Sequence, residues 1–323
     1  MKPVDSNRIH AAVHAGVQTI FGEEAKVQSV EFHSSSLFDL YKVRLTIKDE
    51  SRAESSRGAP GVESGRLIAA KIVASAEMGA TECEGLQALA AAGAPTPACY
   101  GHFAAPDQGL ALLFMDLLAP QARTAKAGSG RLDPGQELAA DLLRLYTPAP
   151  PGTKFGWHRS NFIGSLVQTN HLYERFSDFW WQDRLEAQLR AAGKRGLLDG
   201  NIGRELEAVH ARCVRDWDLD RCVPRLVHGD LWSGNLLHGP GGRMHLIDPS
   251  VAYSNPEQDL AMLDLFGSRL SAGQLEDIAR VAGVGPGLTD RIAYWQLYPL
   301  LVHVNIFGGG YIGQLRAALR VYR

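Results

Sequence analysis

A short segment near residue 230 combines side chains that are suited to phosphoryl transfer. It reads His-Gly-Asp-Leu-Trp-Ser-Gly-Asn over 228–235, so Asp230 and Asn235 lie five residues apart. Transfer of a phosphoryl group to an alcohol needs a carboxylate that orients the hydroxyl and accepts its proton, and it needs oxygen ligands for magnesium. Asp230 is therefore the candidate catalytic base, and Asn235 is a candidate metal ligand.

A second carboxylate follows on a predicted hairpin. The strand-like run Arg243–Ile247 ends at Asp248, and the turn Gly239–Gly242 precedes it. A hairpin closed by this turn would bring Asp248 beside Asn235, where the two side chains offer hard oxygen ligands for Mg²⁺. Asp, Asn, Ser and Gly are also the ordinary residues of turns. The two segments together nevertheless favour a kinase centre over a plain loop.

A lysine in an apolar strand is the candidate phosphate-binding cation. Lys71 lies in Leu67–Val73, whose other residues are all apolar. A single lysine in such a strand often extends its amine to solvent at an edge. In kinases, a strand lysine instead binds the nucleotide phosphates and pairs with a glutamate on a helix. We expect Glu82 to be this partner, with Glu84 as the second choice.

The segment Ala111–Leu118 is a candidate for the adenine contact. It ends the strand-rich part of the chain, so a hinge between two lobes is expected there. Backbone groups around Met115, Asp116 and Leu118 would then be offered to the adenine ring. The same segment also fits a plain buried strand, and the two interpretations are compatible.

The first part of the chain predicts a small sheet with helices. Apolar residues at helical spacing indicate a helix over 7–21, which Asn7 can cap. A second helix is expected over 79–92, and 49–65 reads as a long hairpin loop. The predicted strands cover 27–33, 38–48, 66–74, 98–103 and 110–115.

The rest of the chain is predicted to be mostly helical. A polar connector over 121–130 is followed by helices at about 133–147, 171–192, 197–216, 256–266, 272–281, 287–307 and 309–322, with short strands at 235–238 and 243–248. The pattern predicts an α+β, two-lobe architecture. We expect a nucleotide-binding lobe over 1–118 and a catalytic, acceptor-binding lobe over 119–323, with the chemistry in the cleft between them.

Composition excludes several other classes of protein. The 323 residues are 45% apolar and 21% charged, with a net charge of -2 and a pI near 6.6, so no global basic field would gather nucleic acid. We see no secretion signal and no apolar run long enough to cross a membrane, and we expect a cytoplasmic protein. The four cysteines are far apart in sequence, which favours a reduced state.

These motifs together resemble the fructosamine/ketosamine kinase family, within the wider aminoglycoside phosphotransferase-like superfamily. The core of the resemblance is 228–235 with Ile247–Pro249. Narrower features of the family are matched by Phe155–Trp157, Asn161–Gly164, Glu257–Met262, Leu265–Gly267 and Tyr298–Tyr311.

The resemblance implies a protein-kinase-like fold, ATP and Mg²⁺ as cofactors, and phosphorylation of a sugar hydroxyl on a ketosamine, which is an amine glycated by a sugar. It makes Asp230 the catalytic base. Trp232, Trp157 and Asn161 become candidates beside the acceptor sugar, because aromatic faces suit sugar C–H surfaces, although Trp and Asn also fill packing roles.

Two further residues are expected to support the catalytic segment. An aspartate at a helix start, Asp259, can hold the loop through backbone hydrogen bonds. His228 is expected to orient the loop without transferring protons, since a lone histidine is usually structural unless a reacting group lies beside it.

The chain departs from the resembling family in its nucleotide loop, which usually contains glycines. Here Phe32–Phe38 contains Ser34 and Ser35, whose hydroxyls can bind phosphate although their side chains keep the backbone farther away. Two alternatives stay open: a choline- or aminoglycoside-type phosphotransferase with another amino-alcohol acceptor, and a nucleotide-binding scaffold without turnover. The expected partner is a small-molecule or protein-bound ketosamine, and the expected assembly is a monomer or weak homodimer.

Overall fold

The computed structural model describes residues 5–35, 37–48, 63–118, 134–267 and 270–322. The chain divides into two compact units. The N-terminal unit comprises Met1–Gln87 and Pro97–Ala119, and the C-terminal unit comprises Ala88–Thr96 and Pro120–Arg323. The predicted loop over 49–65 and connector over 121–130 lie largely or wholly outside the described residues. The last three residues of that loop, 63–65, belong to a strand.

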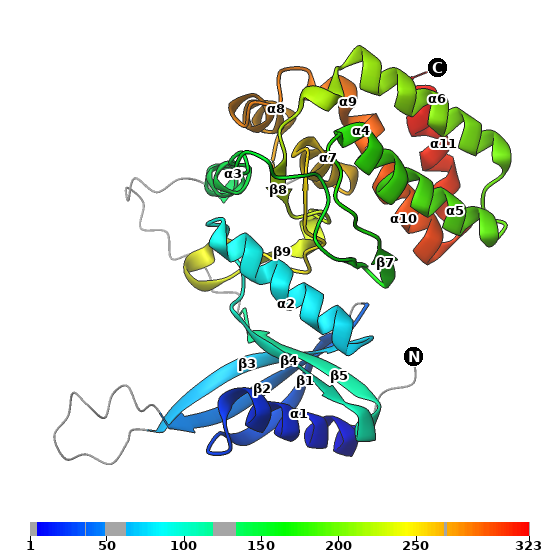
Figure 1. Cartoon of the computed structure of the whole chain (residues 1–323). Coiled ribbons are helices and arrows are strands. Elements are labelled where there is room, and N and C mark those ends of the chain that lie inside the picture. The colour runs from blue at the N-terminus through cyan, green and yellow to red at the C-terminus, as the bar shows by residue number, and fades with distance from the viewer. Residues whose placement is uncertain (1–4, 36, 49–62, 119–133, 268–269, 323) are drawn as a thin grey trace. The chain divides into compact units, whose positions relative to one another are not determined.

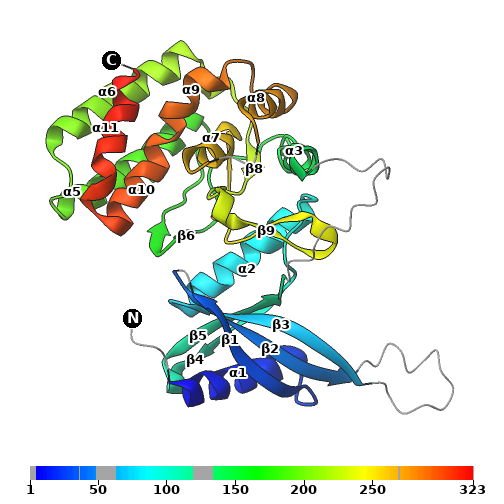
Figure 2. The same ribbon diagram turned by 180° about the vertical axis from the view of Figure 1, so that it is seen from behind.

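The N-terminal unit is built on one five-stranded sheet with the order β1-β2-β3-β5-β4, in which every neighbouring pair is antiparallel. Figures 1 and 2 show α1 on one face of this sheet and α2 on the other. The elements are α1 (Ser6–Phe21), β1 (Lys26–Ser35), β2 (Asp39–Lys48), β3 (Glu63–Val73), α2 (Ala76–Ala91), β4 (Cys99–Ala105) and β5 (Leu110–Asp116).

Helix α1 forms because its apolar residues recur at helical spacing and face the sheet. Ile9, Val13 and Val17 are all fully buried. The predicted cap is wrong: Asp5 caps the helix and accepts a hydrogen bond from the Asn7 backbone N–H at 2.9 Å. Aspartate is as good a cap as asparagine, and its position two residues earlier lets the helix begin at Ser6.

A disulfide joins Cys83 on α2 to Cys99 at the start of β4, with a Cα–Cα distance of 5.5 Å. The expectation that all four cysteines are reduced is therefore wrong for this pair. Sixteen residues separate the two cysteines in sequence, so their proximity arises only when α2 packs against the sheet. Cys213 and Cys222 are free thiols.

In its described residues, the C-terminal unit contains helices and three two-stranded antiparallel ribbons. Its ribbons are β6 (Asn161–Ile163) with β7 (Leu166–Gln168), β8 (Arg225–Val227) with β11 (Ala252–Ser254), and β9 (Leu236–His238) with β10 (Met244–Leu246). Its helices are α3 (Pro134–Leu145), α4 (Phe176–Phe179), a π-helical stretch (Trp180–Glu186), α5 (Ala187–Lys194), α6 (Gly200–Asp216), α7 (Glu257–Leu265), α8 (Ala272–Val281), α9 (Leu288–Trp295), α10 (Leu297–Phe307) and α11 (Ile312–Arg320).

Two predicted helices differ from the observed ones for local reasons. The helix expected from 171 begins only at Phe176, because Tyr173 exchanges backbone hydrogen bonds with Phe155 and is held extended. The helix expected over 287–307 is divided at Gln296 into α9 and α10. Pro299 lies in the first turn of α10 and has no N–H to continue the helical ladder.

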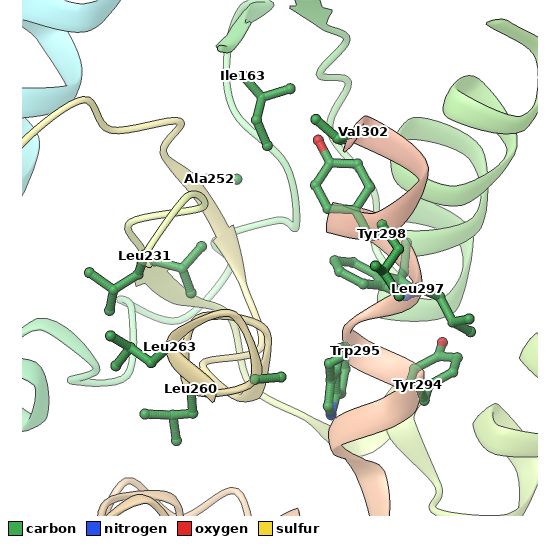
Figure 3. Packing of buried hydrophobic residues seen from close by; sticks show 14 of the residues in the cluster. Ile163, Leu231, Ala252, Leu260, Leu263, Tyr294, Trp295, Leu297, Tyr298 and Val302 are labelled. Carbon is green, nitrogen blue, oxygen red and sulfur yellow. The ribbon is translucent and has the colours of Figure 1, made fainter. Parts of the chain in front are cut away.

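The core of the C-terminal unit surrounds α10 and α7. Figure 3 shows Trp295 of α9 and Tyr298 of α10 among these buried residues, and it shows Leu231 beside Leu260 and Leu263 of α7. Leu231 belongs to the predicted catalytic segment and is fully buried. Burial of one leucine side chain contributes about 1.5–3 kcal/mol, so this residue anchors the segment to the core. No helix among the described residues is long and apolar enough to cross a membrane.

Candidate active site

The segment 228–235 follows β8 and is fixed at its first turn to Ser250, two residues before β11. The Ser250 backbone N–H donates to the His228 carbonyl at 2.8 Å. Gly229 has φ +84°, and a Cβ at this position would overlap the Ser250 carbonyl oxygen. Only glycine fits this turn, because the positive φ and the close approach both exclude a side chain.

Asp259 on α7 holds the same turn from below. Its fully buried carboxylate accepts the backbone N–H groups of His228 at 2.7 Å and Gly229 at 2.9 Å, and the Tyr146 hydroxyl at 3.3 Å. Burial raises the pKa of Asp259 to about 6, and the three hydrogen bonds act in the opposite direction. The predicted supporting role of Asp259 has a direct structural basis in these contacts.

His228 is buried and connects the turn to β10. Its Nε2 lies 2.9 Å from the Ile247 carbonyl, and its Nδ1 accepts the Asp230 backbone N–H at 3.2 Å. Burial lowers the pKa of His228 to about 4, so the ring is neutral near pH 7. A neutral ring with both nitrogens engaged orients the loop and carries no exchangeable proton toward a substrate.

Asp230, Asn235 and Asp248 come together as the spacing predicts. The Asn235 side-chain nitrogen donates to Asp230 twice, to the carbonyl at 2.8 Å and to Oδ2 at 3.1 Å. The Ile247 backbone N–H donates to the Asn235 carbonyl at 3.1 Å, beside the β9–β10 hairpin. Burial and then repulsion from the Asp248 carboxylate raise the pKa of Asp230 to about 7.

The side chains at the centre fit a magnesium site of the kind completed by phosphate. Because the Asn235 amide nitrogen faces Asp230, its amide oxygen would be left to bind a metal ion, and it accepts no hydrogen bond within the described ranges. Asp248 has φ 55° and lies two residues after the end of β10. Among the described residues, no three His, Cys, Asp or Glu side chains form a metal cage. Mg²⁺ is usually held by one or two protein oxygens with phosphates and waters.

Lys71 and Glu82 form a buried ion pair in the N-terminal unit. The Lys71 ammonium lies 2.7 and 2.8 Å from the two Glu82 carboxylate oxygens, and both side chains are less than one tenth exposed. Glu82, and not the second choice Glu84, is therefore the partner of Lys71. The pair connects β3 to α2, one residue before the disulfide at Cys83.

The other predicted nucleotide residues lie on the same sheet. Ser34 and Ser35 are exposed at the end of β1, and Met115 is buried in β5. The Asp116 carboxylate accepts the Ala98 backbone N–H at 3.0 Å and the Tyr100 hydroxyl. This carboxylate thus ties β5 to β4. The backbone groups around Met115, Asp116 and half-buried Leu118 remain the predicted adenine contact.

The three predicted acceptor residues occupy different environments. Trp232 is 37% exposed directly beside the catalytic turn. Trp157 is half-buried and packs against Tyr253, with ring centroids 5.6 Å apart. Asn161 is buried: its nitrogen donates to the Val251 carbonyl at 2.9 Å, and its oxygen accepts from Gln168 at 2.8 Å. Its contacts are those of a supporting residue, and its part in acceptor binding stays a prediction.

Sequence reasoning missed Tyr298 and Gln168. The Tyr298 hydroxyl donates to the Gln168 side-chain oxygen at 2.5 Å, and the Gln168 nitrogen reaches the Ser250 carbonyl at 3.1 Å. Burial, together with the charge of Asp230, raises the pKa of Tyr298. Tyr298 therefore lies near the Asp230 carboxylate. Its place at the start of the motif Tyr298–Tyr311 was the available signal.

Comparison with known proteins agrees with this geometry. The sequence model of the fructosamine kinase family matches residues 68–322. The chain belongs to the fructosamine kinase family. A probable ketoamine kinase of Synechocystis sp. is 34% identical over 248 residues, which cover 76% of this chain and 78% of the relative. A probable ketoamine kinase of Enterococcus faecium is 35% identical over 188 residues, covering 57% and 67%.

Solved structures support the same fold. A putative fructosamine-3-kinase of Thermobifida fusca superposes with a TM-score of 0.75 at 27% identity, covering 96% of this chain and 98% of that one. An aminoglycoside phosphotransferase shares the fold at 16% identity, with a TM-score of 0.58. The predicted α+β, protein-kinase-like fold is confirmed. As a fructosamine kinase relative, the chain is a phosphotransferase that acts on a hydroxyl group, which sets aside the scaffold without turnover.

Proposed function

We propose that this protein transfers the γ-phosphoryl group of ATP to a sugar hydroxyl of a ketosamine, with Mg²⁺ as cofactor. The observation that carries the proposal is the arrangement of Asp230, with its carboxylate turned to Asn235 and its pKa raised beside Asp248. A carboxylate whose pKa lies near neutrality suits the acceptance of a hydroxyl proton. Membership in the fructosamine kinase family supports the ketosamine as acceptor.

In the proposed reaction, Asp230 accepts a hydrogen bond from the acceptor hydroxyl and receives its proton. The hydroxyl oxygen forms a bond to the γ-phosphorus, while the bond from this phosphorus to the β–γ bridging oxygen breaks and ADP leaves. Asn235 and Asp248 are the residues that would hold Mg²⁺, which neutralises charge on the phosphates when bound. Asp259 and His228 act at a distance, because they fix the backbone that carries Asp230.

The proposed ATP contacts are on the N-terminal unit. Lys71, oriented by Glu82, supplies a cation for the phosphates, which is the arrangement that phosphoryl transfer uses in protein kinases. Ser34 and Ser35 are proposed phosphate contacts, and the backbone around Met115, Asp116 and Leu118 is the proposed adenine contact. A structure with an ATP analogue, Mg²⁺ and a small ketosamine tests these contacts.

The test is ADP release with ATP, Mg²⁺ and a panel of acceptors. We expect turnover of a fructosamine, no turnover of choline or an aminoglycoside, and loss of activity in Asp230→Asn. Asp277→Asn is the matched control, because Asp277 is an exposed aspartate on α8. Turnover of the amino alcohols without the ketosamines would replace this proposal by the amino-alcohol kinase. Equal rates for wild type and Asp230→Asn would reject the catalytic assignment.

A further inference from the structure

A row of aromatic rings extends from the catalytic turn along the surface of the C-terminal unit. We call the side chains of Trp232, Phe266, His303, Phe307 and Tyr311 the aromatic ladder. Successive ring centroids lie 5.9 Å apart from Trp232 to Phe266, 4.8 Å from Phe266 to His303, and 5.5 Å from His303 to Phe307. Tyr311 lies 4.9 Å from His303 and 6.0 Å from Phe307.

The rings of the ladder come from four segments: the turn after Asp230, the C-terminal end of α7, α10, and the 3₁₀ turn Gly309–Tyr311. The Trp232 ring covers Gly234, where an added Cβ would overlap it, so a glycine is needed under the ring. Phe266 ends α7, and His303 and Phe307 are one turn apart on α10. His303 Nδ1 lies 2.7 Å from the Pro299 carbonyl, and burial lowers the pKa of this histidine, which favours the neutral ring.

Its two ends remain open to solvent. Trp232 is 37% exposed and Phe307 is 56% exposed, whereas the rings between them are half-buried. An aromatic ring with more than half of its surface in water gains little from folding. The ladder therefore offers apolar surface that a ligand can cover.

The position of the ladder identifies what would cover it. Trp232 is two residues from Asp230, so the first ring belongs to the same turn as the proposed catalytic base. A ketosamine carries its amine substituent on the same sugar, so the substituent leaves the catalytic residue in some direction along the surface. The row of rings provides one such direction. Ring faces attract ammonium groups and stack with apolar and aromatic groups, whereas a carboxylate gains nothing from them.

We propose that the aromatic ladder binds the amine substituent of the acceptor and selects alkyl or aromatic amines over amines that carry a carboxylate. This inference rests on the proposed ketosamine kinase activity. It assigns Phe266, His303, Phe307 and Tyr311 to acceptor specificity. Among these, Phe307 is the most exposed and therefore the most accessible to a substituent.

The test compares three fructosamines that share one sugar: those of benzylamine, methylamine and glycine. ADP release gives kcat and KM for each. We expect the benzylamine derivative to have the lowest KM. Phe307→Ala should raise this KM about fivefold, with kcat, the KM for ATP and the KM for the methylamine derivative unchanged. Phe307→Trp should restore the low KM, since it restores an aromatic face.

Val281→Ala is the matched control, because Val281 is an apolar residue on α8 that is 59% exposed. It should leave all three acceptors unchanged. If Phe307→Ala changes the KM values of the benzylamine and methylamine derivatives equally, or changes neither, the ladder is not the amine site. The proposed kinase activity would still stand. If the wild type phosphorylates none of the three, the proposed function itself fails, and this inference fails with it.

Discussion

The two units hold their reactive charges by different means. In the N-terminal unit, Lys71 is neutralised by Glu82 inside the protein, and the helix that carries Glu82 is fastened by the adjacent disulfide. In the C-terminal unit, Asp259 is held by backbone N–H groups, and Asp230 and Asp248 repel one another. The first arrangement is complete before any ligand binds. The second gains from a cation or a proton.

The difference teaches how each unit should respond to change. An ion pair fails when one partner is removed and recovers when both are removed, because the cost lies in the buried charge left behind. The loss of a carboxylate that accepts backbone N–H groups cannot be compensated by a second substitution, because the backbone groups cannot be removed. Substitutions can therefore separate the two kinds of support.

The largest effect is expected for Asp259→Ala. The change leaves the His228 and Gly229 N–H groups buried without an acceptor, at a cost of about 4 kcal/mol. Because the same groups fix the catalytic turn, kcat should fall by more than 100-fold in any protein that still folds. Urea unfolding and ADP release measure the two effects. Normal stability with normal kcat would show that Asp259 does not support the turn.

A somewhat smaller loss is expected for Lys71→Met. The substitution leaves Glu82 buried without this cation and should cost about 3 kcal/mol. The double variant Lys71→Met, Glu82→Leu should regain most of the stability while the KM for ATP stays high, because the phosphate cation is still absent. A double variant no more stable than the single would contradict the account of the pair. A normal KM for ATP would remove Lys71 from the nucleotide site.

Reduction of the disulfide is expected to weaken the N-terminal unit alone. The Cys83–Cys99 bond closes a loop across a separation of 16 residues, which corresponds to about 2–3 kcal/mol. Dithiothreitol should lower the melting temperature and raise the KM for ATP, with kcat little changed. The double variant Cys83→Ala, Cys99→Ala should have the melting temperature and the KM for ATP of the reduced protein, and dithiothreitol should change neither. A reductant effect that persists in this variant would assign it to Cys213 or Cys222.

Acid should destabilise the C-terminal unit through buried histidines. Burial lowers the pKa of His210 to about 4, from an ordinary 6.5. As the pH falls, the unfolded chain therefore takes up this proton before the folded protein does. His210 leaves the free energy of unfolding unchanged above pH 7 and lowers it as the pH drops from 6.5 toward 4, by about 1.4 kcal/mol per pH unit. His210→Gln should flatten this part of the curve. His228 acts in the same direction, and Asp230 and Asp259 act in the opposite one, so the difference between variant and wild type is the quantity to compare.

The sequence predicted best where a motif and a local element coincide. The Asp230–Asn235–Asp248 arrangement follows from one loop and one adjacent hairpin, and Lys71 with Glu82 follows from a strand and the next helix. It predicted least where distant segments meet. Packing between distant segments, which no local sequence pattern indicates, produces three features. They are the Cys83–Cys99 disulfide, the β8–β11 ribbon with its three-residue strands, and the contact of Tyr298 with Gln168.

For Asn161, the sequence motif was recognised, but the environment of the side chain could not be predicted. The motif around it was found, but an asparagine can face a substrate or a neighbouring backbone with equal chemical ease. Asn161 is buried and bonded to Val251 and Gln168 because it belongs to the β6–β7 ribbon. Strands of three residues are too short to be predicted from the sequence pattern.

The most direct test of the central claim is ³¹P NMR of the product formed from ATP, Mg²⁺ and the benzylamine fructosamine. The account predicts a new phosphate monoester on the sugar, formed in equal amount to ADP by the wild type and by Asp277→Asn, and absent with Asp230→Asn. Release of inorganic phosphate without a monoester, or a monoester formed at the wild-type rate by Asp230→Asn, would contradict it.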